Sequence, residues 1–331
     1  MHRLIATTGL LLWVMAAAPW LTSGAHAQAI ATPGANGFLA GMADIGGRSL
    51  YFECLGSGSP TVILEAGFRT RADVWTDDLI QPDAPRTMVL PGVAEFTRVC
   101  AYDRPGTATG RDGALQRSRS DPAPMPRTAH DAVNDLHALL AAAGIPGPYV
   151  LVGHSFGGLF VRLYAATYPD EIIGMVLVDA FSEALEDEMT AQQWAAYDEI
   201  FQPVPPALAD YGDLEFTDLD ASTDQMRDAA AASPLRPLPL VVLSRGQAMA
   251  MPDDLPGGLT GAMLEDAWQS AQDELAVLLP DARQVIATES EHYIQLQQPQ
   301  LVIDAVRAVV DAVRDPASWP RATPVASPVP R

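Results

Sequence analysis

Short apolar runs alternate with amphipathic segments along most of this chain. The short runs predict strands because most are rich in Val, Leu and Ile; they lie at residues 149–152, 175–178, 240–244 and 283–288. The amphipathic segments predict helices at residues 127–140 and 299–310. In the first helix, Ala129, Val133, Leu136 and Leu140 recur at helical spacing, so they mark the side that we expect to be buried.

One strand-like run breaks directly into Gly153-His-Ser-Phe-Gly157, and helix-like residues 159–166 follow. A strand that passes straight into a helix forces the residue between them into a strained turn. Gly153 and Gly157 leave room for that turn, and Ser155 stands exposed at its tip. The sequence therefore predicts a nucleophile elbow with Ser155 as the nucleophile. A glycine-rich phosphate loop is the alternative, but its lysine and its glycine spacing are missing.

A serine hydroxyl is a weak nucleophile unless a base takes its proton, and His292 is the histidine best placed to act as that base. It lies in a loop after the strand at 283–288, where it can meet a serine at the top of a sheet. The other histidines are His2, His26, His130, His137 and His154. The first two lie in a segment that we expect to be removed, and the next two flank the buried stripe of a helix. His154 should pack beside the elbow, and no ligand spacing predicts a metal site.

Motifs along residues 49–310 resemble those of the α/β-hydrolase superfamily, specifically its single-domain serine hydrolases. They are Glu-Ala-Gly at 65–67, Tyr-Asp-Arg-Pro-Gly at 102–106, the elbow at 153–157 and Ser-Glu-His-Tyr at 290–293. The resemblance implies an α/β-hydrolase fold, a mostly parallel eight-stranded sheet flanked by helices, with a small helical cap. It also implies an enzyme that needs no cofactor.

The acid that orients the histidine should lie between Ser155 and His292 in the chain, at the end of a strand. Asp179 closes an otherwise apolar strand, where a carboxylate needs a partner. Asp253 follows the strand at 240–244 after a loop, in a polar setting between prolines. The Gly-x-x-Asp that the family usually carries in that loop is also missing. We predict Asp179 as the acid and keep Asp253 in reserve; a helix N-cap or loop anchor is the alternative role for Asp179.

The resemblance also assigns the oxyanion hole to the backbone N–H groups of Phe68 and Phe156. Two fixed amide donors would stabilise the negative charge that develops on the former carbonyl oxygen of a tetrahedral intermediate. The family's strand order further makes neighbours of the segments that contain Cys54 and Cys100. Because an exported protein meets an oxidising compartment, we predict a Cys54–Cys100 disulfide; two buried thiols are the alternative.

The N-terminus carries Arg3, an apolar run from Leu4 to Leu21 and a small-x-small site at residues 25–27. This pattern predicts a secretory signal peptide cut before Gln28 and export to a periplasm or to the cell exterior; a retained membrane anchor is the alternative. We expect no membrane span after cleavage. The expected divisions are a signal peptide (1–27), a flexible leader (28–40), the hydrolase domain (41–314) and a disordered proline-rich tail (315–331).

The pattern changes between residues 182 and 236, where we expect a helical cap inserted into the domain. Two helix-like segments are followed by a proline-rich turn and an acidic loop around residues 210–220. The cap's large apolar side chains are Trp194, Tyr197, Phe201 and Met226. These are candidates to line an acyl pocket, although we expect at least half of them to pack among the cap's own helices.

The formal net charge of −21, with 20 Arg and no Lys, argues against nucleic acids and anionic membranes as partners. At 331 residues and 48% hydrophobic composition, the chain can bury one large core. Nothing in the sequence indicates the oligomeric state.

These features together predict a secreted serine hydrolase that cleaves a carboxylic ester, or an amide or lactone, of a small and largely apolar substrate. Ser155 would form an acyl-enzyme, His292 would carry the proton and Asp179 would hold His292. A cofactor-free perhydrolase or a C–C bond hydrolase would use the same triad. A non-catalytic binding protein on a hydrolase scaffold is a further alternative, and its function would survive the loss of Ser155.

Overall fold

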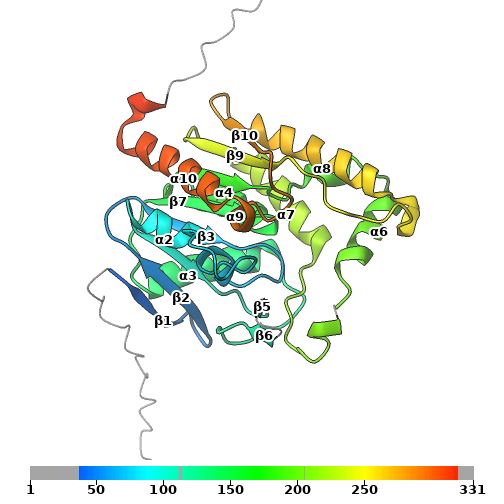
Figure 1. The fold of residues 1–331 in the computed structure, drawn as a ribbon, viewed down its shortest axis with the longest axis horizontal. Coiled ribbons are helices and arrows are strands. Elements are labelled where there is room, and N and C mark those ends of the chain that lie inside the picture. Colours follow the sequence, from blue (N-terminus) through cyan, green and yellow to red (C-terminus); the bar gives the residue numbers. More distant parts are fainter. Residues whose placement is uncertain (1–36, 112–113, 205, 320–331) are drawn as a thin grey trace, which may run out of the picture.

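The computed structural model describes residues 37–111, 114–204 and 206–319. The predicted signal peptide, most of the predicted leader and residues 320–331 of the predicted tail lie outside the described residues. Figure 1 shows one twisted sheet with helices on both of its faces.

The sheet has eight strands in the order β1-β2-β4-β3-β7-β8-β9-β10. They are β1 (Leu39–Asp44), β2 (Ser49–Leu55), β3 (Thr61–Glu65), β4 (Val99–Tyr102), β7 (Tyr149–His154), β8 (Ile172–Val178), β9 (Leu240–Arg245) and β10 (Arg283–Ala287). The β1–β2 and β2–β4 pairs are antiparallel, and every other pair is parallel. The predicted mostly parallel eight-stranded sheet is confirmed.

Two layers of helices cover the sheet. One face carries α1 (Asp73–Thr76), α2 (Val89–Ala94), α9 (Ile294–Gln297) and α10 (Pro299–Arg314), and the other carries α3 (Ala129–Ala142), α4 (Phe156–Thr167), α7 (Leu219–Ala232) and α8 (Gly261–Ala276). Central strands bury both faces: in β7, Leu151 packs into one layer while Val150 and Val152 pack into the other. This two-sided burial explains why the central runs are continuously apolar rather than alternating.

Both ends of the domain extend further than the sequence predicted. Leu39 and Ala40, assigned to the leader, lie in β1 and pair with Cys54 and Glu53 of β2. In the predicted tail, η3 (Pro316–Ser318) leads to Trp319, which is only 8% exposed. Its indole Nε1 donates to the carbonyl of Asp281 at 3.1 Å. The prediction of disorder was therefore wrong for residues 315–319, because the Trp319 ring packs into the hydrophobic core although it lies in a proline-rich segment.

The predicted cap divides into two parts with different roles. Its first part contains α5 (Ala184–Asp187), α6 (Ala191–Phe201) and η1 (Pro206–Leu208), and we use the name cap for these elements. Its last helix, α7, belongs to the main body, since Ser222 and Gln225 accept hydrogen bonds from the backbone N–H groups of Ala129 and His130 in α3, at 3.0 and 2.9 Å. Residues 209–218, here named the return segment, connect the two parts.

The predicted acidic loop at residues 210–220 is wrong at its C-terminal end, where α7 begins. Asp218 is the N-cap of α7, because its side chain accepts a hydrogen bond from the N–H of Ala221. Within this loop, Glu215 is buried. A hairpin that the sequence did not suggest follows the Tyr-Asp-Arg-Pro-Gly motif at residues 102–106. It consists of β5 (Ala108–Arg111) and β6 (Ala114–Arg117).

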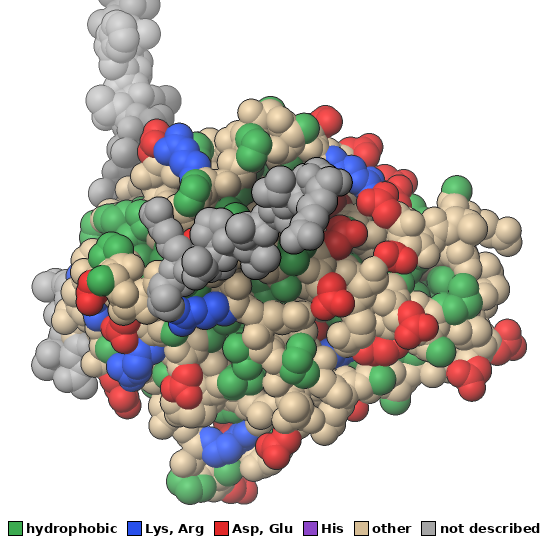
Figure 2. Space-filling model, turned by 90° about the horizontal axis from the view of Figure 1, so that it is seen from above, with side chains coloured by type: hydrophobic (Ala, Val, Ile, Leu, Met, Phe, Trp, Pro, Cys, Tyr) green, Lys and Arg blue, Asp and Glu red, His purple; other side chains and the backbone are tan. Residues whose placement is uncertain are grey.

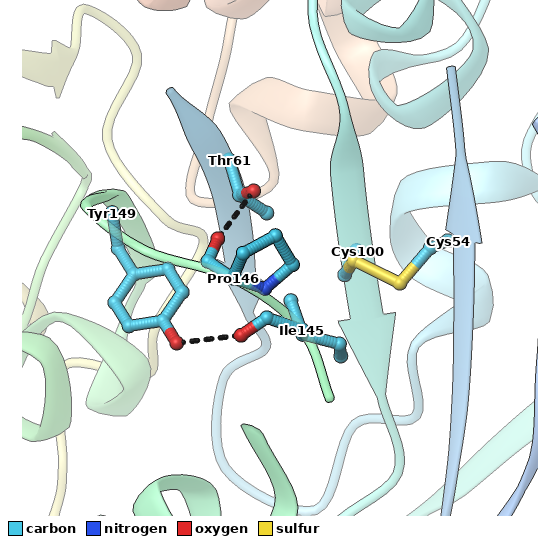
Figure 3. The surroundings of a disulfide bond; sticks show 6 residues. All are labelled: Cys54, Thr61, Cys100, Ile145, Pro146 and Tyr149. Atoms are coloured by element: carbon cyan, nitrogen blue, oxygen red, sulfur yellow. Dashed lines mark hydrogen bonds between the residues drawn. A yellow bond between two sulfur atoms is a disulfide. The ribbon is translucent and has the colours of Figure 1, made fainter. Parts of the chain in front are cut away.

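Cys54 and Cys100 lie directly opposite each other in the β2–β4 ladder and are joined by a disulfide, with their Cα atoms 4.0 Å apart (Figure 3). The same region is tied by side-chain bonds to backbone: Thr61 donates to the carbonyl of Pro146 and Tyr149 donates to that of Ile145, each at 2.8 Å. The disulfide therefore crosslinks the antiparallel side of the sheet.

Acidic side chains are spread over the face seen in Figure 2, with a few arginines among them. On α8, Asp266, Asp273 and Glu274 are exposed. Among the described residues, no helix combines the length and the apolar character needed to cross a bilayer.

Candidate active site

The strand β7 passes directly into α4, and Ser155 is the single residue between them. Its backbone has φ 52° and ψ −126°, a strained conformation for a residue with a side chain. The Ser155 N–H donates to the carbonyl of Val178 at 3.1 Å, and the Ser155 carbonyl accepts from the N–H groups of Gly158 and Phe181, each at 2.8 Å. Neighbouring backbone therefore holds the turn in its strained shape.

The glycines on either side of Ser155 are required by close backbone contacts. A Cβ atom on Gly153 would lie 2.5 Å from the carbonyl oxygen of Gly157, and one on Gly157 would lie 2.6 Å from that of Ala66. The strand–turn–helix geometry that the sequence predicted is present, and it presents Ser155 at the C-terminal end of the parallel strands.

His292 lies between β10 and α9, and its Nδ1 atom is 2.7 Å from Oδ2 of Asp179. Asp179 follows β8 immediately and is completely buried. Asp253, the reserve acid, is exposed in the loop between β9 and η2 (Pro256–Gly258). Of the two acids considered from the sequence, Asp179 is the one that the fold brings to the histidine.

The carboxylate of Asp179 accepts hydrogen bonds on both oxygens. Trp268 Nε1 and the backbone N–H of Arg245 donate to Oδ1, each at 3.1 Å, and the Arg245 guanidinium donates to Oδ2 at 2.9 Å. Burial would raise the pKa of Asp179, but the hydrogen bond with His292 and the charges of His292 and Arg245 outweigh it, so the pKa is lowered. The acid is thus held in its ionised form.

Sequence reasoning missed both Arg245 and Trp268. Arg245 is the last residue of β9 and is itself bridged to Glu265 at 2.7 Å. An arginine that ends a buried apolar strand was the available signal, since such a charge needs a buried partner.

Ser155 and His292 line one cavity of about 210 Å³. Its walls are largely aromatic and apolar and include Phe68, Phe156, Phe181, Tyr197, Phe201, Leu219, Met249, Met251, Leu264 and Trp268. Of the cap side chains proposed from the sequence, Tyr197 and Phe201 line this cavity. Trp194 instead stacks on Tyr197 and donates to Asp220 at 2.7 Å, while Met226 is buried in the core.

Phe68 and Phe156, whose N–H groups were assigned to the oxyanion hole, both border the cavity, with ring centroids 6.1 Å apart. Phe156 is the first residue of α4, so its N–H has no acceptor within the helix. Phe68 follows Gly67, where a Cβ atom would lie 2.9 Å from Nδ1 of His154 and 3.0 Å from Cβ of Ser155. The glycine therefore lets the backbone before Phe68 approach the elbow.

His154 is buried beside the elbow, as the sequence suggested, and its Nε2 atom lies 3.0 Å from the carbonyl oxygen of His292. Burial and the neighbouring charge of His292 lower the pKa of His154 to about 3. A neutral ring has one N–H, and a carbonyl can only accept, so Nε2 carries the hydrogen. His154 thereby holds the backbone of the loop that carries His292.

Within residues 37–111, 114–204 and 206–319, no group of three or more His, Cys, Asp and Glu side chains is placed to hold a metal ion.

Comparison with known proteins gives a consistent result. The family model described as alpha/beta hydrolase fold matches residues 60–255. The uncharacterized protein YqjL of Bacillus subtilis is 27% identical over 247 residues, which cover 75% of this chain and 82% of YqjL. Lipase LipV of Mycobacterium tuberculosis is 37% identical over 102 residues, which cover 30% of this chain and 38% of LipV.

Among solved structures, Est816, described as an N-acyl homoserine lactone degrading enzyme, superimposes with a TM-score of 0.52 at 16% sequence identity. The superposition covers 81% of this chain and 99% of Est816. At that identity the likeness concerns the fold alone.

Proposed function

The chain belongs to the alpha/beta hydrolase fold family, and on that premise we propose that it is a serine hydrolase that acts through an acyl-enzyme. One observation carries the proposal. The 2.7 Å contact between Asp179 and His292 lies at the same cavity as Ser155, which stands at the tip of a strained strand-to-helix turn. A nucleophile, a base and an orienting acid in one place are what acyl transfer needs.

In this mechanism His292 takes the proton of the Ser155 hydroxyl as Ser155 attacks the substrate carbonyl. The N–H groups of Phe68 and Phe156 stabilise the oxyanion of the tetrahedral intermediate. Asp179 keeps the His292 ring oriented and stabilises its charged form. His292 then gives the proton to the leaving group, and a water molecule activated by His292 releases the acyl group.

We propose a carboxylic ester, or less favourably an amide or lactone, of a small and largely apolar molecule as the substrate. The cavity walls support this choice because they are mainly aromatic and aliphatic. Arg245, a cation at the cavity, is already paired with Asp179 and Glu265, which leaves it poorly placed to bind an anionic substrate. A lactone is also consistent with the reaction named for the structural neighbour Est816.

We also propose that the protein is exported after removal of residues 1–27. The N-terminal sequence pattern supports this proposal, and a disulfide between Cys54 and Cys100 is the kind of bond that persists in oxidising compartments.

The proposed activity is tested by labelling the chain of residues 28–331 with a fluorophosphonate probe and measuring its intact mass. We expect one probe per molecule on the wild type and none on Ser155→Ala or His292→Ala. The same three proteins are then compared on short-chain p-nitrophenyl esters. A wild type that is folded but neither labels nor hydrolyses any ester would overturn the proposal in favour of a binding protein.

A further inference from the structure

A buried carboxylate from the return segment reaches the loop that would form half of the oxyanion hole. This loop, residues 66–69, is here named the oxyanion loop. Glu215 accepts the backbone N–H of Arg69 on its Oε2 atom at 2.6 Å. It also accepts two hydrogen bonds from the Arg104 guanidinium, from Nε at 2.7 Å and from Nη2 at 2.9 Å. One side chain thus contacts the oxyanion loop directly and through an arginine.

Arg104 extends from Glu215 to the first part of the oxyanion loop. Its Nη1 atom donates to the carbonyl of Ala66 at 2.8 Å and to Glu65, and its Nη2 atom donates to the carbonyl of Gly67 at 2.7 Å. Arg104 is buried, and burial alone would lower its pKa, yet Glu215 and Glu65 raise that pKa above its ordinary value. The guanidinium is therefore a permanently charged brace between two carboxylates and the loop.

The hydrogen bonds of Arg104 and Glu215 fall on the two peptide units that flank Phe68. The carbonyl of Gly67 and the N–H of Phe68 belong to one planar trans peptide unit, so they point in opposite directions. A donor that holds the Gly67 carbonyl on one side therefore aims the Phe68 N–H to the other side. The peptide unit between Phe68 and Arg69 is fixed by the hydrogen bond from the Arg69 N–H to Glu215. Arg69 itself has a φ of 57°.

Glu215 is itself rigidly placed. Its own N–H donates to the carbonyl of Gly106 at 2.8 Å, in the same turn that carries Arg104. The return segment is also tied to the chain just before α3, because the backbone N–H of Arg127 donates to the carbonyl of Phe216 and the Arg127 carbonyl accepts from the N–H of Asp218, each at 2.8 Å. The carboxylate consequently acts from a fixed platform and not from a flexible loop.

We propose that Glu215 is a positioning residue for the oxyanion hole: through Arg104 and the Arg69 N–H, its carboxylate fixes the orientation of the Phe68 amide. This inference rests on the proposed serine hydrolase function. It assigns to the return segment, which the family motifs do not include, a direct part in setting the geometry of the reaction.

The Arg69 side chain also links the oxyanion loop to the return segment, this time with the loop residue as the donor. Its guanidinium donates to the carbonyls of Gln202, Pro203 and Glu215, at 2.8, 3.0 and 3.0 Å. The end of α6, the return segment and the oxyanion loop therefore form one hydrogen-bonded unit, and a shift of the return segment would reach the Phe68 amide.

The substitution Glu215→Gln tests the proposal with little change of shape. The glutamine amide has an NH₂ group in place of one carboxylate oxygen that accepts hydrogen bonds in the wild type. This NH₂ group is a donor, so it cannot accept the hydrogen bond from the Arg69 N–H or from the Arg104 guanidinium. Arg104 keeps Glu65 as a counter-ion, so no buried cation is left unpaired. Asp213→Asn is the matched control, because Asp213 lies in the same segment and is exposed.

The decisive measurement compares p-nitrophenyl butyrate with the thionoester in which sulfur replaces its carbonyl oxygen. Sulfur is a weak hydrogen-bond acceptor, so thionoester turnover depends little on the oxyanion donors. We expect Glu215→Gln to lower kcat on the oxygen ester by roughly 10- to 100-fold, with KM changed by less than about 2-fold, since a displaced donor should cost no more than a deleted one. The ratio of oxygen-ester to thionoester kcat should fall by a similar factor, and Asp213→Asn should match the wild type.

An equal loss on both substrates, or no loss, would overturn the positioning role while leaving the serine hydrolase proposal intact. Labelling of the wild type by the fluorophosphonate tests that proposal separately. If Glu215→Gln does not fold, as judged by near-ultraviolet circular dichroism, Glu215→Asp takes its place. The aspartate keeps a negative charge beside Arg104, but its shorter side chain no longer reaches the Arg69 N–H. The ratio of oxygen-ester to thionoester kcat then tests the proposal in the same way.

Discussion

Arg245 contacts Asp179 through both its backbone and its side chain. Its N–H lies 3.1 Å from Oδ1 and its guanidinium lies 2.9 Å from Oδ2 of the same carboxylate. The residue that ends β9 thus braces an acid that follows β8, one strand earlier. The strand β9 therefore supplies a cation that contacts Asp179, whereas Asp179 itself follows β8.

The two aspartates that the sequence proposed for the acid can be separated by mutation. Asp179→Asn should lower kcat by about 10⁴-fold, because an amide can no longer hold His292 in its productive tautomer and stabilise its charge. Asp253→Asn should leave kcat within about 2-fold of the wild type, since its side chain is exposed. Steady-state kinetics on one p-nitrophenyl ester checks both; equal effects at the two positions would contradict this assignment.

Loss of the Arg245 guanidinium should destabilise the fold. Arg245→Met removes the arginine partner of a fully buried carboxylate, and breaking such a pair costs about 3–5 kcal/mol. Urea unfolding at pH 7 measures the free energy of unfolding. The control is Arg236→Met, which breaks an exposed pair with Asp170 and should change that free energy by less than about 1 kcal/mol. Similar losses in the two variants would be inconsistent with a buried ion pair at Asp179.

The buried histidine beside the elbow should make stability depend on pH. His154 has a pKa of about 3 in the folded protein against 6.5 for the free side chain, so the unfolded chain binds the proton first as the pH falls. This contribution to stability is complete above pH 6.5 and is lost below it, by up to about 1.4 kcal/mol per pH unit.

His154→Gln keeps a donor for the carbonyl of His292 but does not titrate. Between pH 5 and 6.5 its free energy of unfolding should therefore fall less steeply with decreasing pH than that of the wild type. The exposed His130, changed to Gln, provides the control and should leave the slope unchanged. Equal slopes for His154→Gln and the wild type would show that His154 is not buried in its neutral form.

The disulfide should stabilise the sheet without affecting the chemistry. Cys54 and Cys100 are 46 residues apart, and a crosslink of that span is worth about 4 kcal/mol through the entropy of the unfolded chain. The double variant Cys54→Ala/Cys100→Ala should lose about that much in urea unfolding while keeping kcat at 25 °C. A reductant should lower the stability of the wild type alone, and a wild type that does not respond would show that the bond is absent.

The elements that the sequence predicted well are those with local causes. The strands β7, β8 and β9 are buried on both faces, so their continuous apolar runs can be recognised in the sequence without knowing which strands lie beside them. The turn at Ser155 needs small residues within two positions on either side, and Gly153 and Gly157 supply them. His292 could be selected because few histidines were available and only one followed the last strand.

Tertiary structure decided everything that depends on partners far apart in the chain. The Asp179–His292 contact joins residues 113 positions apart, and the Glu215–Arg69 contact spans 146. Nothing local distinguished Glu215 from the exposed acids around it, because burial of a charge depends on whether an opposite charge arrives from elsewhere. The position of Arg245 at the end of a buried strand indicated a buried partner but not which one, and the burial of Trp319 depends on its contacts with Asp281 and Arg283. The sequence by itself determined the central strands and the strand-to-helix turn at Ser155, and it marked His292 as the candidate base; only the packing of distant segments determined which charges meet, since that is set by three-dimensional proximity and not by local preference.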